Sequence, residues 1–109
     1  MEHNFRHENL DVYRLAVRVA QWAAQQGIPA ARRHLRDQLV RAADSVVLNI
    51  AEGCGQDPGA ARRNHFRIAK GSAAETCAVL DLLDLPGAAE RQHELRRVGA
   101  MLSRMCQRG

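Results

Sequence analysis

Apolar residues recur every three or four positions along most of the chain, which is the spacing of one face of an α-helix. In the segment from residue 35 to residue 50, the stripe that faces the predicted core consists of Leu35, Leu39, Ala42, Val46 and Ile50. Similar stripes precede and follow this segment. The pattern predicts four helices, at about residues 10–26, 31–53, 58–84 and 88–107.

The predicted helix over residues 58–84 has two apolar faces where an ordinary surface helix has one. Phe66 lies on the wider face, and a second stripe contains Ile68, Val79 and Leu82. In the preceding helix, Leu48 also points away from the core stripe. We predict that Leu48 and the second stripe form a contact between subunits of a homo-oligomer.

Polar side chains form a row beside the apolar seam of these two helices. Ser45, Asn49 and Glu52 recur at helical spacing, as do Ser72 and Glu75 in the next helix. Buried carboxylates are normally paired, so these residues are interpreted as a polar network within or between subunits. The chain is not expected to be an enzyme, because no nucleophile and oriented base occur together.

The connections between the predicted helices are short. Gly53 or Gly55 is expected to end the second helix in a left-handed conformation, and Asp57 and Pro58 are expected to begin the third. Tight connections favour antiparallel neighbours. The predicted fold class is therefore all-α: one domain over residues 1–109, forming an antiparallel up-down-up-down four-helix bundle.

Several sequence phrases resemble those of a known family. They are LDVY at 10–13 with Ala16, DQL at 37–39, RAADSV at 41–46, NIAEG at 49–53, and FRIAKGS at 66–72 followed by Glu75. Together they are similar to the four-helix bundle proteins encoded in intervening sequences of bacterial large-subunit ribosomal RNA genes. The chain departs from that family's pattern twice: it lacks a proline within residues 45–49, and Gln56 stands where a basic residue is frequent.

The resemblance implies a homopentameric ring of four-helix bundles. It also implies a likeness in shape to the accessory proteins of diversity-generating retroelements, which work with a reverse transcriptase and RNA. No enzymatic activity is attached to this family. The expected partners are therefore further copies of the chain, and RNA, DNA or a protein similar to a reverse transcriptase.

The charge of the chain is compatible with such a partner. The net charge is +4, and the sixteen basic residues include a single lysine. Arginine binds phosphate well, although a GC-rich genome also replaces lysine by arginine. If nucleic acid binds, Arg63, Arg67 and Lys70 are the first expected contacts, with Arg62 and Arg41 next. In the alternative hypothesis, a protein-interaction scaffold, the same side chains form salt bridges and nucleic acid plays no part.

No metal and no cofactor are expected. The three cysteines are far apart and lack the close pairs of a zinc site. A metal or small-molecule site in a central channel is the least favoured hypothesis. The apolar runs are too short to span a membrane, and the first residues do not resemble a signal peptide. These features predict a cytoplasmic protein without membrane contact.

Overall fold

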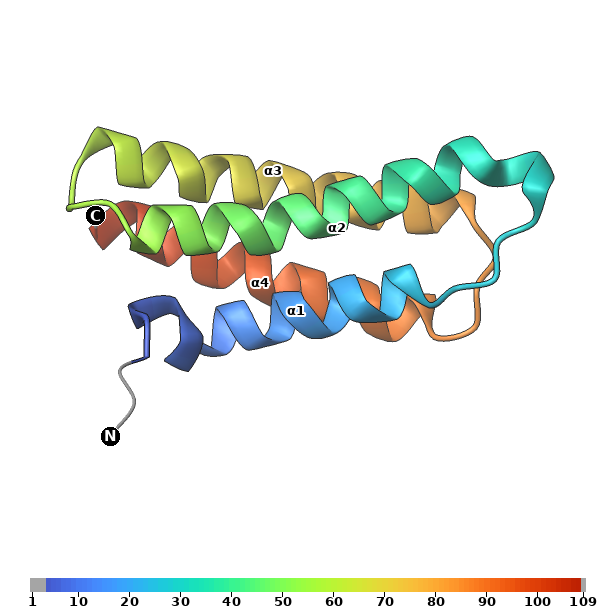
Figure 1. Cartoon of the computed structure of the whole chain (residues 1–109), viewed down its shortest axis with the longest axis horizontal. Coiled ribbons are helices and arrows are strands. Elements are labelled where there is room, and N and C mark those ends of the chain that lie inside the picture. The colour runs from blue at the N-terminus through green and yellow to red at the C-terminus, as the bar shows by residue number, and fades with distance from the viewer. Residues whose placement is uncertain (1–3, 109) are drawn as a thin grey trace.

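A computed structural model describes residues 4–108, except for the side chain of residue 108. It contains the short 3₁₀ segments η1 and η2 and four α-helices. Their bounds are η1 Arg6–Asn9, α1 Asp11–Ala24, η2 Ala30–Arg32, α2 Arg33–Cys54, α3 Ala60–Leu82 and α4 Ala88–Arg108. The helices lie side by side along the long axis of a body that measures 43 × 32 × 21 Å (Figure 1). The all-α prediction is confirmed.

Each helix packs against its neighbours in the sequence, and α4 returns to contact α1. The α1–α2 and α3–α4 connections lie at one end of the bundle, and the α2–α3 connection lies at the other (Figure 1). Arg32 of η2 closes the first of these ends, because its Nη2 atom donates a hydrogen bond to the carbonyl oxygen of Leu82 at 2.6 Å.

The core lies along the axis between the four helices. Leu39, Ile50 and Phe66 are among its largest fully buried side chains, together with Val98 and Leu102 of α4. The predicted core stripe of α2 is buried at all five positions. Burial of these stripes stabilises the bundle, since each large apolar side chain contributes about 1.5–3 kcal/mol on leaving water.

The helix ends differ from the prediction. Gly55 has a right-handed backbone with φ −80°, and Gly53 lies buried within α2, so neither residue is left-handed. The third helix begins after Gly59, whose φ of 148° is accessible mainly to glycine, and not at Asp57 or Pro58.

Candidate nucleic-acid and subunit interfaces

A chain of hydrogen bonds joins α2 to α3 along their line of contact. The Ser45 and Ser72 hydroxyl oxygens are 2.8 Å apart. Asn49 donates through Nδ2 to the carbonyl oxygen of Ser45 at 2.9 Å and to its Oγ at 3.1 Å. His65 Nδ1 lies 3.1 Å from Asn49 Oδ1, and Gln38 Nε2 donates to Glu75 Oε2 at 3.4 Å. We call this set the polar seam.

The polar seam contains four of the five residues predicted for the network. Glu52 is the exception: it is exposed, and its side chain forms no hydrogen bond to the residues that the structure describes. His65 was missed by the sequence reasoning, although it lies seven residues before Ser72 and therefore on the same side of α3. The seam fixes the rotation of α3, because its serine and histidine must face α2.

This rotation determines which apolar residues of the hairpin reach solvent. Leu48, Ile68 and Leu82 are 62%, 43% and 60% exposed. Val79, which was predicted to join them, is only 2% exposed and packs in the core. On a helical wheel Val79, Ile68 and Leu82 lie about 20°, 40° and 80° from Ser72 in the same direction, so Val79 lies nearest the contact with α2.

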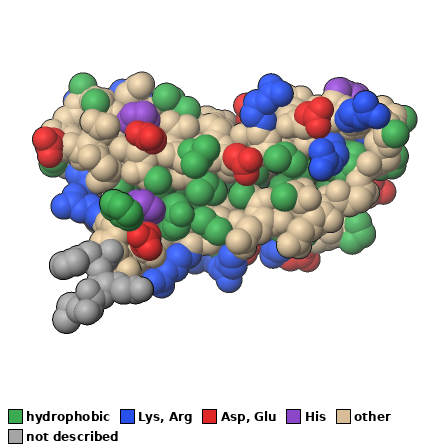
Figure 2. All heavy atoms as spheres, in the orientation of Figure 1, with side chains coloured by type: hydrophobic (Ala, Val, Ile, Leu, Met, Phe, Trp, Pro, Cys, Tyr) green, Lys and Arg blue, Asp and Glu red, His purple; other side chains and the backbone are tan. Residues whose placement is uncertain are grey.

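A shallow apolar groove of about 330 Å³ lies along the contact between α1 and α2. It is lined by Val17, Ala20 and Ala24 of α1 and by Val47 and Leu48 of α2, with Gln21 and Asp44 at its polar parts. Hydrophobic side chains are visible on the face that carries α1 and α2, with charged side chains between and around them (Figure 2). Leu48 thus belongs to an apolar surface larger than one side chain.

The basic residues of α3 lie away from the polar seam. Arg67 and Lys70 are exposed, and Arg63 is half-buried. At about 100° per residue these three positions fall on the side of α3 opposite Ser72. Within residues 4–108, ion pairs join Arg36 to Asp37 and Arg91 to Glu94, so the basic residues of this edge of α3 are free to meet an anion.

The other two predicted nucleic-acid contacts are not part of this edge. Arg62 is half-buried, and its guanidinium carbon lies 5.8 Å from the centre of the Phe66 ring. A cation over an aromatic face is attracted by the ring, so Arg62 contributes to packing. Arg41 is exposed on α2, a different helix from the basic edge. The structure therefore separates the five predicted residues.

A second basic surface lies between α1 and α4, and the sequence reasoning did not identify it as a site. A groove of about 420 Å³ is lined by Arg14 and Arg18 of α1 and by Arg97 of α4. Leu15 and Met101 form its apolar part, and Asp11 is its one carboxylate. We call this the arginine groove. The spacing of four between Arg14 and Arg18 was visible in the sequence, but the proximity of Arg97 was not.

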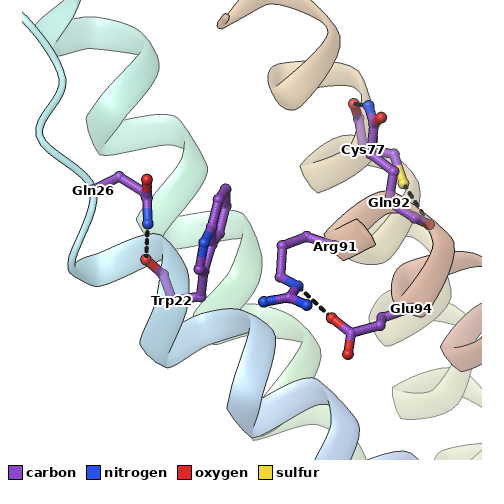
Figure 3. A network of polar contacts seen from close by, with 6 residues as sticks. All are labelled: Trp22, Gln26, Cys77, Arg91, Gln92 and Glu94. Atoms are coloured by element: carbon purple, nitrogen blue, oxygen red, sulfur yellow. Dashed lines mark hydrogen bonds and ion pairs between the residues drawn. The ribbon is translucent and has the colours of Figure 1, made fainter. Parts of the chain in front are cut away.

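Polar contacts of α4 fasten it to α3 and α1 (Figure 3). Gln92 Nε2 donates to the carbonyl oxygen of Cys77 at 3.0 Å and to Asp81 Oδ1 at 2.8 Å. Arg91 pairs with Glu94 and also lies over the Trp22 ring, 5.9 Å from its centre. The contacts of Gln92 with α3 and of Arg91 with Trp22 cross helix boundaries, whereas the Arg91–Glu94 pair lies within α4.

The buried thiols are poor nucleophiles. Burial raises the pKa of the Cys77 thiol above its ordinary value, and Asp81 adds to the rise while Arg96 opposes it. Burial likewise raises the pKa of Cys54, against the effect of the nearby Arg62 and Arg6. Since the thiolate is the reactive form, neither cysteine is activated for catalysis.

Two further properties concern the described part of the chain as a whole. No group of three or more histidine, cysteine, aspartate or glutamate side chains within it is arranged to hold a metal ion. None of its helices combines the length and apolar character needed to cross a lipid bilayer.

Comparison with known proteins identifies a family. The profile of the family described as "23S rRNA-intervening sequence protein" matches residues 8–106, which is nearly the whole chain. No curated protein matches the sequence.

Proposed function

The chain belongs to the 23S rRNA-intervening sequence protein family, and from this premise we propose that it is a non-enzymatic, RNA-binding subunit of a homo-oligomer. Following the family resemblance, the proposed assembly is a pentamer. The proposed arrangement of each subunit is an antiparallel up-down-up-down bundle. The alternating ends at which the three connections lie support that arrangement (Figure 1).

The observation that carries the proposal is the contrast between two sides of α3: one side forms hydrogen bonds to α2 through Ser72 and His65, and the opposite side is basic. The basic side presents Arg67 and Lys70, which are exposed and form no ion pair with the residues that the structure describes. Arginine and lysine that are not paired within the subunit, on a net basic protein, are suited to phosphate. The proposal of RNA binding rests on this availability, and a protein partner that pairs them with its own carboxylates is the alternative that the salt dependence of binding tests.

The outer side of the α2–α3 hairpin supports self-association. Leu48, Ile68 and Leu82 are the exposed large apolar side chains of α2 and α3. Exposed apolar surface on a soluble helix hairpin is stabilised when a partner covers it. In a ring, each subunit contacts its neighbour through two different surfaces. The α1 wall of the groove between α1 and α2, formed by Val17, Ala20 and Ala24, offers a second apolar surface for such a head-to-tail contact.

The non-enzymatic role is supported by the use of the polar side chains. The hydroxyl, amide and imidazole groups of the polar seam bond to one another across the α2–α3 contact. The Cys77 thiol lies against the carbonyl oxygen of Gln92 at 3.8 Å and has a raised pKa. These groups are engaged in holding helices together.

Light scattering of the purified protein and of the Leu82→Glu variant tests the assembly. We expect an oligomer whose mass falls toward that of a subunit in Leu82→Glu, because a buried unpaired carboxylate is costly. Ala100→Glu, which adds a similar charge at an exposed position of α4, is the matched control and should keep the oligomer mass. A monomeric natural protein, or a Leu82→Glu variant of unchanged mass, would contradict the proposal.

Binding of a fluorescein-labelled oligouridylate, measured by fluorescence anisotropy, tests the RNA-binding role. Phosphate contacts release counterions, so affinity should fall steeply between about 50 and 200 mM KCl. Reversal of charge at Arg67 and Lys70 should weaken binding and reduce the salt dependence. Absence of binding at the lower salt concentration would favour the protein-interaction scaffold.

A further inference from the structure

The arginine groove lies on a different pair of helices from the basic edge of α3. Arg14, Arg18 and Arg97 converge on it from α1 and α4. Arg104 lines an adjoining hollow of about 180 Å³, which shares Asp11 and Met101 with the groove. The basic surface therefore continues along the contact between α1 and α4.

The arginines of this surface are available for a ligand. All four are exposed, and none forms an ion pair with the residues that the structure describes. Arg14 donates one hydrogen bond, from Nε to the carbonyl oxygen of Glu8 at 3.2 Å, which orients its guanidinium without neutralising it. Asp11 is the one carboxylate among the lining residues, so the groove is net positive.

The shape and lining of the groove fit a nucleic-acid strand. Arg14 and Arg18 are about 6 Å apart along the axis of α1, since a helix rises about 1.5 Å per residue. Their guanidinium groups can thus bind successive phosphates of an extended strand. The half-buried Met101 and the edge of the buried Leu15 form an apolar floor.

We propose that the arginine groove between α1 and α4 is a binding site for the phosphate backbone of single-stranded RNA. This inference rests on the proposed RNA-binding function and adds a second contact surface to the basic edge of α3. Arg18 and Arg97 hold the phosphates from opposite walls, and Arg14 extends the site toward η1. Asp11 limits affinity through repulsion of the same phosphates.

The test compares two double variants with equal changes in charge. Arg18→Glu with Arg97→Glu alters the groove, and Arg33→Glu with Arg36→Glu alters exposed arginines at the start of α2. Binding of the labelled oligouridylate is measured from about 50 to 200 mM KCl, where each lost phosphate contact reduces the salt slope by about 0.7. We expect the groove variant to lose about tenfold or more in affinity and about 1.4 in slope.

Two further variants separate the groove from a general effect of charge. Arg18→Gln with Arg97→Gln removes the cations without introducing carboxylates and should weaken binding less than the glutamate pair. Asp11→Asn should strengthen binding, because it removes the negative charge that faces the phosphates. Circular dichroism of each variant verifies that the helices are retained.

The outcomes distinguish the inference from the proposed function. Equal affinity of the groove variant and the α2 variant would overturn the groove as an RNA site. If charge reversal at Arg67 and Lys70 still weakened binding in that case, the proposed function would stand. If the natural protein did not bind the oligouridylate at the lowest salt, both would fail. Binding to phosphatidylserine vesicles that required Arg18 and Arg97, without RNA binding, would assign the groove to a membrane surface instead.

Discussion

Substitution of Gly53 by alanine should destabilise the protein, although alanine is the better helix former. A Cβ atom at position 53 would lie 2.5 Å from Cε1 and 2.8 Å from Cδ1 of Phe66. Favourable carbon–carbon contacts are about 3.5–4.0 Å long, so the ring must shift. Phe66 is 2% exposed and surrounded by the core, which leaves it little room to do so.

The size of the effect follows from two opposing contributions. Overpacking of a core typically costs about 1–3 kcal/mol. Replacement of glycine by alanine inside a helix contributes up to about 1 kcal/mol in the other direction. A 2.5 Å contact with a buried ring places the cost of overpacking in the upper half of its range, about 2–3 kcal/mol, so the net expectation for Gly53→Ala is a loss of about 1–2 kcal/mol in the free energy of unfolding.

Urea unfolding monitored by circular dichroism measures this loss. All variants are compared at the same protein concentration, because association makes apparent stability depend on concentration. Gly99→Ala in α4 is the matched control: apart from its chain neighbours and the local backbone of its own helix, no atom lies within 4 Å of its added Cβ. It should therefore stabilise the protein by up to about 1 kcal/mol. A Gly53→Ala variant as stable as the natural protein would refute the reasoning.

A double-mutant cycle tests whether Phe66 is the cause. Phe66→Leu removes the ring atoms that the new Cβ would meet, so the cost of Gly53→Ala should fall by about 1 kcal/mol or more in that background. An equal cost in both backgrounds would show that the helix end, and not the aromatic ring, limits position 53.

Two further predictions concern the contact between α3 and α4. Gln92→Ala should lower the free energy of unfolding by about 1–3 kcal/mol, because its hydrogen bonds to Cys77 and Asp81 are lost; unchanged urea unfolding would contradict this. Cys77 should react with iodoacetamide at pH 8 more slowly in the folded protein than in urea, as measured by mass spectrometry of the alkylated peptides. Burial raises the pKa of this thiol, so its thiolate and its reactivity should increase only at higher pH; equal rates in both states would refute the assignment.

The sequence predicted the core better than the helix ends. Leu39, Val46 and Ile50 recur at helical spacing, and a periodic stripe of this kind must face the interior wherever the helix packs. Gly53 was interpreted as a helix terminator, yet it permits close approach of Phe66, and Gly59 adopts the positive φ. A glycine can end a helix or permit close packing within it. Which of the two Gly53 does depends on Phe66, thirteen residues later in the sequence.

The interfaces were harder to predict because they depend on the rotation of each helix. Val79 and Ile68 belong to one stripe on a helical wheel, but the Ser45–Ser72 contact turns the first inward and leaves the second exposed. The arginine groove requires Arg14 and Arg97 to meet from opposite ends of the sequence. The spacing of residues within one helix does not predict that Arg14 and Arg97 lie close together. Their proximity arises because α4 packs against α1.

The two kinds of surface occupy different parts of the bundle. The exposed large apolar side chains of the four α-helices belong to α2 and α3, whereas the arginine groove belongs to α1 and α4. No close contact joins α2 to α4 within the described residues, which places these helices diagonally across the bundle. Subunits that associated through the outer side of the α2–α3 hairpin and the α1–α2 groove would leave the arginine groove open, because Arg14 and Arg18 of α1 are not among the residues that line the α1–α2 groove. Each added subunit would present another groove to the same strand, so that assembly would raise RNA affinity through avidity without changing any single contact.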